Sequence, residues 1–177
     1  FDTLNKNSFA LINIDDKNGK FMTQNSSARV YTYSIKSKSN FSCRIVEQQL
    51  NGMLLNIENS EIWTKLIGEF NAYNVLAIYS VGKIYELDSL NLLTNISQLN
   101  SVQGRLQSFL SNSNVTVIID YGHTPVAIEN VLSTINKIKK SDQNLITVIG
   151  CGGDRDRAKR SIIGKICSDL SYKVIFT

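Results

Sequence analysis

A chain of 177 residues with 42% hydrophobic and 19% charged residues has a globular composition, long enough for one ordinary domain or for parts of two. Its net charge of +4 comes from Lys and Arg mixed with Asp and Glu, which does not argue for nucleic acid or an anionic membrane as a partner. No apolar run approaches the roughly 20 residues that a transmembrane helix needs, and no signal sequence stands at the start.

The three cysteines indicate a reducing compartment. Cys43, Cys151 and Cys167 are odd in number, far apart in the sequence and without a CxxC pair. That spacing indicates free thiols and argues against a disulfide framework or a zinc site. The sequence therefore predicts a cytoplasmic protein.

The first third of the chain predicts β-strands. Stretches rich in β-branched residues, with alternating apolar and polar positions, are separated by polar turns. The pair Asn51-Gly52 separates two of these stretches and predicts a tight hairpin, because it tolerates the positive φ that such turns need. We expect strands at 9–14, 29–35, 41–50, 52–57 and 62–67.

The hydrophobic period then changes to that of helices. Between residues 69 and 87, apolar residues recur at steps of three and four, which predicts an amphipathic helix. A second helix is expected at about 89–99, and a domain boundary near Ser101. The expected apolar side of the first helix consists of Phe70, Tyr73, Leu76, Ala77, Ser80, Val81 and Ile84.

From residue 102 onward, short apolar strands alternate with helices. Pro125 marks the start of the first of these helices, because proline suits the first helical position. The alternation predicts a parallel sheet with crossover helices, and hence an α/β fold. Strands are expected at 106–110, 115–119, 145–149 and 174–176, and helices at 125–140 and 160–170.

A polar cluster, Asp120-Tyr121-Gly122-His123-Thr124-Pro125, directly follows the predicted strand 115–119. Ligands of open parallel sheets bind at the carboxyl ends of the strands. Asp120 suits the two hydroxyls of a ribose, because a carboxylate accepts two hydrogen bonds, but it equally suits a helix cap or a turn. His123, the single histidine, is either a nucleotide contact, a proton relay or a structural residue.

A second polar cluster, from Gly150 to Arg157, follows the predicted strand 145–149. If the two strands are parallel neighbours, both clusters lie on one edge of the sheet. The Gly152-Gly153 pair allows backbone amides to approach a ligand, whereas Arg155 among its acidic neighbours also fits a solvated loop closed by ion pairs. The chain contains no GxxxxGK[ST], GxGxxG or GxSxG motif and no metal-spaced Cys/His set.

Three further polar residues are candidate ligand contacts. Asn71 and Asn74 lie three apart near the start of the predicted helix 69–87, which places both carboxamides on one face. A carboxamide offers a donor and an acceptor together and so suits the edge of adenine, while helix capping is the alternative. Arg105 suits a phosphate or ribose, or an ion pair with a surface carboxylate.

These motifs resemble those of the Mur ligase family, and the resemblance covers essentially the whole chain. It is carried by four segments in a fixed order. They are Gly68-Glu69-Phe70-Asn71-Ala72-Tyr73-Asn74, Gly104-Arg105, Asp120-Tyr121-Gly122-His123-Thr124-Pro125, and Gly150-Cys151-Gly152-Gly153-Asp154-Arg155-Asp156-Arg157-Ala158-Lys159-Arg160. Asp15-Asp16 and Tyr31-Thr32-Tyr33 also resemble the central domain of the family.

The resemblance implies an arrangement of domains and a reaction. Residues 1–101 are expected to be the end of the central ATPase domain, and 102–177 the first half of a Rossmann-like C-terminal ligase domain. The last motif points to a ligase that uses ATP and Mg²⁺ to add meso-diaminopimelate or L-lysine to UDP-N-acetylmuramoyl-L-alanyl-D-glutamate in peptidoglycan synthesis, through an acyl phosphate. Nucleic acid and membranes are not expected partners. The alternatives are a folylpolyglutamate or cyanophycin synthetase type of amide ligase, or a non-catalytic nucleotide-binding domain.

The resemblance also assigns roles to residues. It implies that Asn71 and Asn74 bind the adenine side of ATP, and that Arg105 and Asp120 contact the nucleotide from the C-terminal domain, with His123 in the same motif. Arg155 matches the arginine that holds a carboxylate of the incoming diamino acid.

The sequence departs from the family pattern at a few positions. Gln103 stands where the family often has Pro, Gly122 where Ala is common, and Val126 where Asp is usual. The phosphate-binding loop GTxGKT, the Mg²⁺ carboxylate and the modified lysine of the family are expected upstream of Phe1, and its DNPR motif after Thr177. We therefore expect an internal fragment that is inactive on its own.

Overall fold

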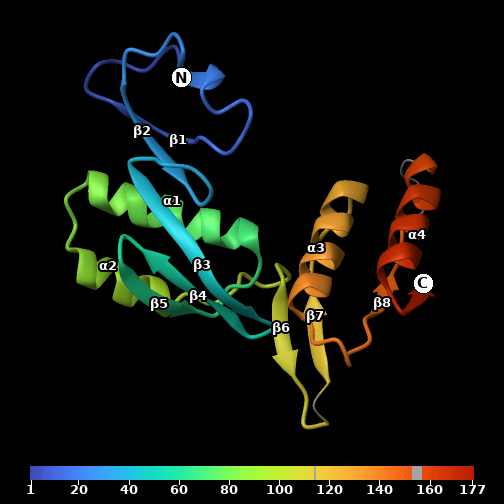
Figure 1. The fold of residues 1–177 in the computed structure, drawn as a ribbon. Helices are drawn as coiled ribbons and strands as arrows, with labels where there is room; N and C mark the ends of the chain where they lie inside the picture. Colours follow the sequence, from blue (N-terminus) through green and yellow to red (C-terminus); the bar gives the residue numbers. More distant parts are fainter. Residues whose placement is uncertain (114, 153–156) are drawn as a thin grey trace. The chain divides into compact units, whose positions relative to one another are not determined.

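The computed structural model describes residues 1–113, 115–152 and 157–177. The chain divides into two compact units, unit 1 (Phe1–Asn100) and unit 2 (Ser101–Thr177). Both units combine strands and helices, so the α/β prediction is confirmed (Figure 1).

Unit 1 is built on a five-stranded mixed sheet with the strand order β1-β2-β3-β4-β5. β1, β2 and β3 run parallel to one another, whereas β3, β4 and β5 form antiparallel pairs. All five strands predicted for this region are present, although the fifth begins and ends earlier than predicted. The strands are β1 (Phe9–Asn13), β2 (Arg29–Ser34), β3 (Phe41–Gln49), β4 (Gly52–Ile57) and β5 (Ser60–Thr64), and a short 3-10 helix lies at Phe21–Thr23.

The hairpin predicted at Asn51-Gly52 is confirmed, because Gln49 pairs with Gly52 in the β3–β4 ladder. The positive φ lies at Gly52 (155°) and not at Asn51. An added Cβ at Gly52 would collide with the carbonyl oxygen of Thr64 and lie 2.8 Å from the Trp63 ring. Glycine is therefore required here by the close approach of β5 as well as by its backbone conformation.

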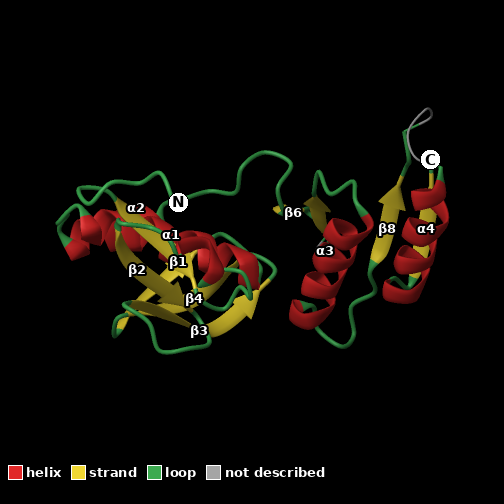
Figure 2. Ribbon diagram, turned by 90° about the horizontal axis from the view of Figure 1, so that it is seen from above, coloured by secondary structure: helices red, strands yellow, loops and turns green. Residues whose placement is uncertain are grey.

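Helices α1 (Glu69–Ile84) and α2 (Ser89–Ser97) lie on the same face of this sheet (Figure 2). α1 stops at Ile84, earlier than the predicted residue 87, because the chain turns in a Schellman motif. Leu87 N donates to Gly82 O at 3.0 Å and Glu86, at φ 58°, donates to Lys83 O at 3.0 Å.

The core of unit 1 lies between β4 and the two helices. Alternate residues of β4 point inward, as the twofold period of a strand requires, and they meet helical residues spaced three and four apart. The buried residues include Met53, Leu55 and Ile57 of β4, Ala72, Val75, Leu76 and Tyr79 of α1, and Leu93 and Ile96 of α2.

The predicted apolar side of α1 is partly wrong. Leu76 and Ser80 are buried as predicted, but Phe70 is 41% exposed and Val81 is 37% exposed, while Ala72, Val75 and Tyr79 are buried instead. Apolar residues occur nearly all round α1, so its sequence contains two overlapping stripes at helical spacing. Packing on the sheet selects the stripe that contains Ala72, Val75 and Tyr79.

The described residues of unit 2 form two short ladders and two helices. β6 pairs antiparallel with β7, and β8 pairs parallel with β9 across α4, which is the predicted crossover connection. α3 and α4 pack on each other through Ile128, Leu132, Ile163 and Cys167. The elements are β6 (Gln107–Leu110), β7 (Thr116–Ile119), α3 (Pro125–Ile138), β8 (Ile146–Ile149), α4 (Ala158–Leu170) and β9 (Lys173–Phe176).

The expectation of a single parallel sheet in this region is not met. Over the described residues, no ladder joins β7 to β8, and β6 runs antiparallel to β7. Packed helices lie about 8–10 Å apart, which is roughly twice the spacing of paired strands. The packing of α3 on α4 therefore does not by itself bring β7 and β8 into hydrogen-bonding distance.

Candidate functional site

The first turn of α1 carries the two asparagines that the sequence singled out. Asn74 Nδ2 donates to Asn71 Oδ1 at 3.2 Å, so the two carboxamides share one face, as predicted. Asn71 Nδ2 donates to the carbonyl oxygen of Ile67 at 2.9 Å. The N-cap position is Gly68, at φ 93° and without a side-chain cap, so neither asparagine caps the helix. Within the described part of the chain, Asn74 Oδ1 accepts no hydrogen bond and is open to a ligand donor.

Behind this turn lies a polar group that the sequence analysis did not identify, which we call the Asp15 cluster: Asp15, Ser34, Ile35, Lys36 and Tyr73. The Asp15 carboxylate accepts from Ser34 Oγ at 2.7 Å, from the Ile35 and Lys36 amides at 3.0 and 3.2 Å, and from Tyr73 Oη at 2.9 Å. Its residues lie far apart in sequence, so the only sequence signal was the Asp15-Asp16 pair.

The Asp15 cluster favours an ionised aspartate beside a protonated tyrosine. Burial raises the pKa of Asp15, but hydrogen bonds from Ser34, Tyr73 and the Ile35 amide together outweigh burial and hold the pKa below 3.8. Burial, helped by the hydrogen bond to Asp15, raises the pKa of Tyr73 well above 10.0. The phenol therefore remains a donor at every physiological pH.

The lowered pKa of Asp15 predicts a pH dependence of unit 1. Because the folded-state pKa lies below the unfolded value, the stabilisation is complete above 3.8 and is lost as pH falls through the folded-state pKa. We expect the difference in free energy of unfolding between wild type and Asp15→Asn to be larger at about pH 6 than at about pH 3. Urea unfolding followed by fluorescence of Trp63, the single tryptophan, measures it. A difference that does not vary with pH would contradict this assignment.

In unit 2, Asp120 follows β7, and its carboxylate is held by backbone amides. Oδ2 accepts from Leu106 N at 2.9 Å and Oδ1 accepts from Gly122 N at 2.6 Å. Asp120 therefore stabilises a turn and does not cap a helix. The N-cap of α3 is Thr124, whose hydroxyl accepts from Ala127 N at 3.2 Å. Each carboxylate oxygen has further lone-pair capacity, so the turn does not exclude a ligand hydroxyl.

Arg105 and His123 both contact the ring of an exposed tyrosine, Tyr121. The Arg105 guanidinium carbon is 5.2 Å from the centroid of the Tyr121 ring, in a cation–π contact. The His123 ring meets Tyr121 edge-on at 5.4 Å, and His123 Nδ1 lies 3.3 Å from Tyr121 O. Tyr121 is 64% exposed, so an exposed aromatic ring adjoins two candidate nucleotide contacts. Tyr121 is not among the site residues predicted from the sequence, although it stands next to Asp120 in the same motif.

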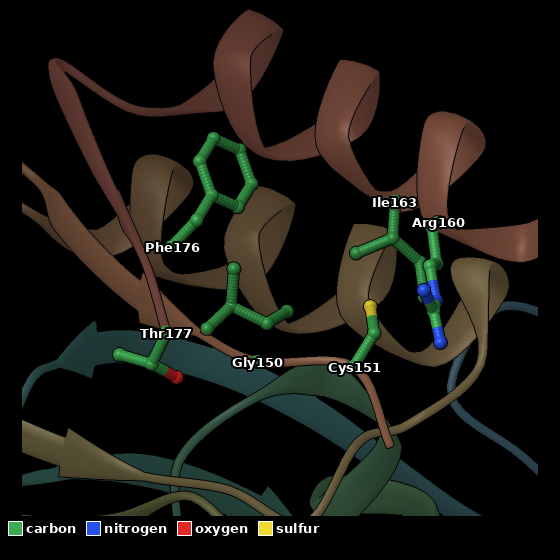
Figure 3. A pocket seen from close by; sticks show the side chains of 7 residues that line it. Gly150, Cys151, Arg160, Ile163, Phe176 and Thr177 are labelled. Atoms are coloured by element: carbon green, nitrogen blue, oxygen red, sulfur yellow. The ribbon is translucent and has the colours of Figure 1, made fainter. Parts of the chain in front are cut away.

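Gly150, Cys151 and Gly152, the first residues of the second polar cluster, directly follow the carboxyl end of β8. A hollow of about 220 Å³ opens there between β8, β9 and α4 (Figure 3). Figure 3 shows the Cys151 thiol and the Arg160 side chain on one side of it and Phe176 on the other. Its lining residues are Ile149, Gly150, Cys151, Arg160, Ile163, Phe176 and Thr177. The candidate substrate residue Arg155 lies outside the described residues.

The described residues include no cluster of metal-ligating side chains. Among residues 1–113, 115–152 and 157–177, no three His, Cys, Asp or Glu side chains are grouped so that they could hold a metal ion. We therefore assign Mg²⁺ to no residue here. Among the same residues, no helix has the length and apolar character needed to cross a membrane.

Comparisons with known proteins match both units. The model of the Mur ligase middle domain matches residues 1–82, and that of the Mur ligase glutamate ligase domain matches residues 104–177. The chain is 44% identical over 177 residues to the UDP-N-acetylmuramoyl-L-alanyl-D-glutamate--2,6-diaminopimelate ligase of Phocaeicola vulgatus, covering 100% of the chain and 37% of that protein. For the protein of the same name from Cytophaga hutchinsonii, the identity is 41%, covering 100% of the chain and 36% of the relative.

Solved structures agree with these matches. A structure of a UDP-N-acetylmuramoyl-L-alanyl-D-glutamate--2,6-diaminopimelate ligase superposes with a TM-score of 0.67 at 26% identity, over 96% of this chain and 36% of the other. A folylpolyglutamate synthase from Thermotoga maritima reaches 0.70 at 17% identity, over 90% of this chain and 37% of the other, and shares the fold. The chain thus spans a little over a third of the length of these relatives. With a middle-domain segment followed by a glutamate ligase segment, it belongs to the Mur ligase family.

Proposed function

We propose that the protein containing this chain is an ATP-dependent ligase that adds meso-diaminopimelate to UDP-N-acetylmuramoyl-L-alanyl-D-glutamate. One observation carries the proposal: proteins named for that reaction are 40–44% identical to this chain over its whole length. Their names favour diaminopimelate over L-lysine. The proposal includes a cytoplasmic location, where ATP is available.

The proposed domains follow the two units. We assign residues 1–101 to the end of a central ATPase domain and 102–177 to the first half of a Rossmann-like ligase domain, which the division at Asn100 and Ser101 supports. Parallel sheets are normally covered on both faces. Val117, Ile119 and Val148, at alternate positions of β7 and β8, are between 46% and 64% exposed, which fits a sheet of which only part is present.

The proposed reaction forms an amide bond in two steps. The γ-phosphoryl group of ATP passes to the γ-carboxylate of D-glutamate, and the amine of the diamino acid then attacks the acyl phosphate and expels phosphate. Such chemistry depends mostly on positioning of the reactants. In this chain, Asn71 and Asn74 would hold the adenine edge, Asp120 a ribose hydroxyl and Arg105 the ribose or a phosphate.

Two further assignments complete the proposed site. Tyr121, in contact with Arg105 and His123, would offer a stacking surface to the nucleotide, and Arg155 would bind a carboxylate of the diamino acid. The hollow beside Cys151 and Arg160 supports a small-ligand site at this end of β8, because ligands of parallel sheets bind where the strands end. Mg²⁺ is expected with ATP, but no step is derived through it.

A change at Asn71 tests the proposal. In the full-length protein, we expect Asn71→Ala to raise the KM for ATP about tenfold, because losing hydrogen bonds to the base is worth about 1.4 kcal/mol. Phosphate release is measured with the acceptor nucleotide and either meso-diaminopimelate or L-lysine. Asn95→Ala, on the exposed side of α2, is the matched control and should leave the KM unchanged.

The outcome separates the proposal from its rivals. Turnover with meso-diaminopimelate supports it, and turnover only with a folate or with a peptide of aspartate would indicate another amide ligase of this fold. Tight ATP binding without any turnover, unaffected by Asn71→Ala, would indicate a non-catalytic nucleotide-binding domain.

A further inference from the structure

We propose that Asp15 and Tyr73 are positioning residues for nucleotide binding: together they hold the first turn of α1 so that Asn71 and Asn74 face the adenine. The inference rests on the proposed function, since it assigns an ATP-binding role to that turn. Neither Asp15 nor Tyr73 is a ligand contact in the proposed site.

The first turn of α1 lacks the usual means of fixing a helix start. Its N-cap is Gly68, which has no side chain to accept hydrogen bonds from the turn. Glycine at this position also allows the chain to enter the helix at φ 93°. The direction in which Asn71 and Asn74 point therefore depends on contacts other than a side-chain cap, among them the packing of Ala72 and Val75 in the core.

The loops after β1 and after β2 each supply one such contact. Tyr73 Oη donates to Asp15 Oδ2 at 2.9 Å, and Lys36 Nζ lies 2.7 Å from Glu69 Oε1. The Lys36–Glu69 pair is 61% and 45% exposed, and exposed ion pairs contribute little. The hydrogen bond from Tyr73 to a charged, half-buried carboxylate is the stronger restraint.

The position of Tyr73 on the helix suits this role. Successive helical residues are about 100° apart, so Tyr73 projects about 100° away from Asn74 and about 160° away from Asn71. A restraint on that side opposes rotation of the turn about the helix axis. Because Asn74 donates to Asn71, both carboxamides move together if the turn rotates.

Asp15 is itself held before Tyr73 binds it. Ser34 Oγ and the amides of Ile35 and Lys36 donate to the same carboxylate, and Ser34 is fully buried. Tyr73 therefore binds a carboxylate that is fixed relative to the sheet and does not move with the helix. The pair joins α1 to the carboxyl ends of β1 and β2.

A matched pair of tyrosines in α1 tests the inference. Tyr79 Oη, later in the same helix, donates to Glu58 Oε2 at 2.9 Å, so Tyr73→Phe and Tyr79→Phe each remove one hydroxyl that binds a carboxylate. In the full-length protein, we expect Tyr73→Phe to raise the KM for ATP about fivefold and to change kcat less than about twofold. Tyr79→Phe should leave the KM for ATP unchanged, and neither should alter the KM for the acceptor.

Hydrogen exchange gives a readout that does not depend on turnover. Peptides containing residues 69–74 should exchange faster in Tyr73→Phe than in wild type and at the wild-type rate in Tyr79→Phe. Equal KM values for ATP in the two variants, or equal exchange, would overturn the inference even if the ligase activity is found. A wild-type protein that binds no ATP would overturn the proposed function itself.

Discussion

Asp120→Ala should lower the free energy of unfolding of unit 2 by about 3 kcal/mol, since hydrogen bonds to a charged group are each worth about 1.5–3 kcal/mol. The carboxylate accepts from the Leu106 and Gly122 amides, which adjoin the same end of the β6–β7 ladder, one before β6 and one after β7. Leu106 is 2% exposed, and shortening Asp120 removes the carboxylate to which its part-buried amide donates. The loss is therefore larger than that of a surface aspartate.

Two further variants make this result specific. Asp142→Ala is the control, because Asp142 is exposed and its side chain makes no hydrogen bond to any described residue. Asp120→Asn keeps one acceptor oxygen and should lie between wild type and alanine. Hydrogen exchange of unit 2 peptides in denaturant measures all three. If Asp120→Ala were no less stable than Asp142→Ala, the carboxylate would not hold this turn.

Ser34→Ala should lower the free energy of unfolding of unit 1 by about 2–3 kcal/mol, although it removes a single oxygen atom. Ser34 Oγ donates to Asp15 at 2.7 Å and accepts from the amides of Lys36 and Ser37 at 2.9 and 2.6 Å. Ser34 is fully buried, so its hydroxyl binds these protein groups and not water. Alanine leaves the Ser37 amide unpaired and Asp15 with one donor fewer.

Ser80→Ala is the matched control for this prediction. Ser80 is equally buried, but its hydroxyl donates only to Leu76 O within α1, at 2.6 Å. That carbonyl already accepts a helical N–H, and alanine is the better helix former by a few tenths of a kcal/mol, so we expect a change below about 0.5 kcal/mol. Fluorescence of Trp63 during urea unfolding reports on both variants. Equal losses would show that burial alone, and not the number of partners, determines the effect.

Much of the fold could be predicted because it depends on short-range pattern. The strands of unit 1 appear where β-branched residues alternate, and Asn51-Gly52 forms the predicted hairpin. The order of the four motifs was sufficient to indicate the family, which the matches to both domains confirm. The spacing of Asn71 and Asn74 also placed both carboxamides on one face, since three residues nearly complete a helical turn.

The face of α1 that is buried could not be predicted in the same way. Its sequence contains apolar residues on nearly every side, so periodicity alone does not choose among them. The face that is buried depends on the shape of the sheet, where Met53, Leu55 and Ile57 form one core cluster with Ala72 and Val75. Whether β7 and β8 are neighbours could not be predicted for a similar reason, because the order of strands depends on how the helices pack on them.

Local patterns along the chain predict most of the helices and strands, and they give the order of the motifs and the residue types available for a nucleotide site. The surroundings of those residues follow from the folded arrangement: Asp15 binds Tyr73, 58 positions away, and Asp120 binds the Leu106 amide, 14 positions away. A hydrogen bond requires its donor and acceptor to lie within about 3 Å of each other. For residues far apart in the sequence, the folded structure and not the local hydrophobic pattern sets that distance. Local pattern specifies which groups are present, and packing specifies which of them are brought together.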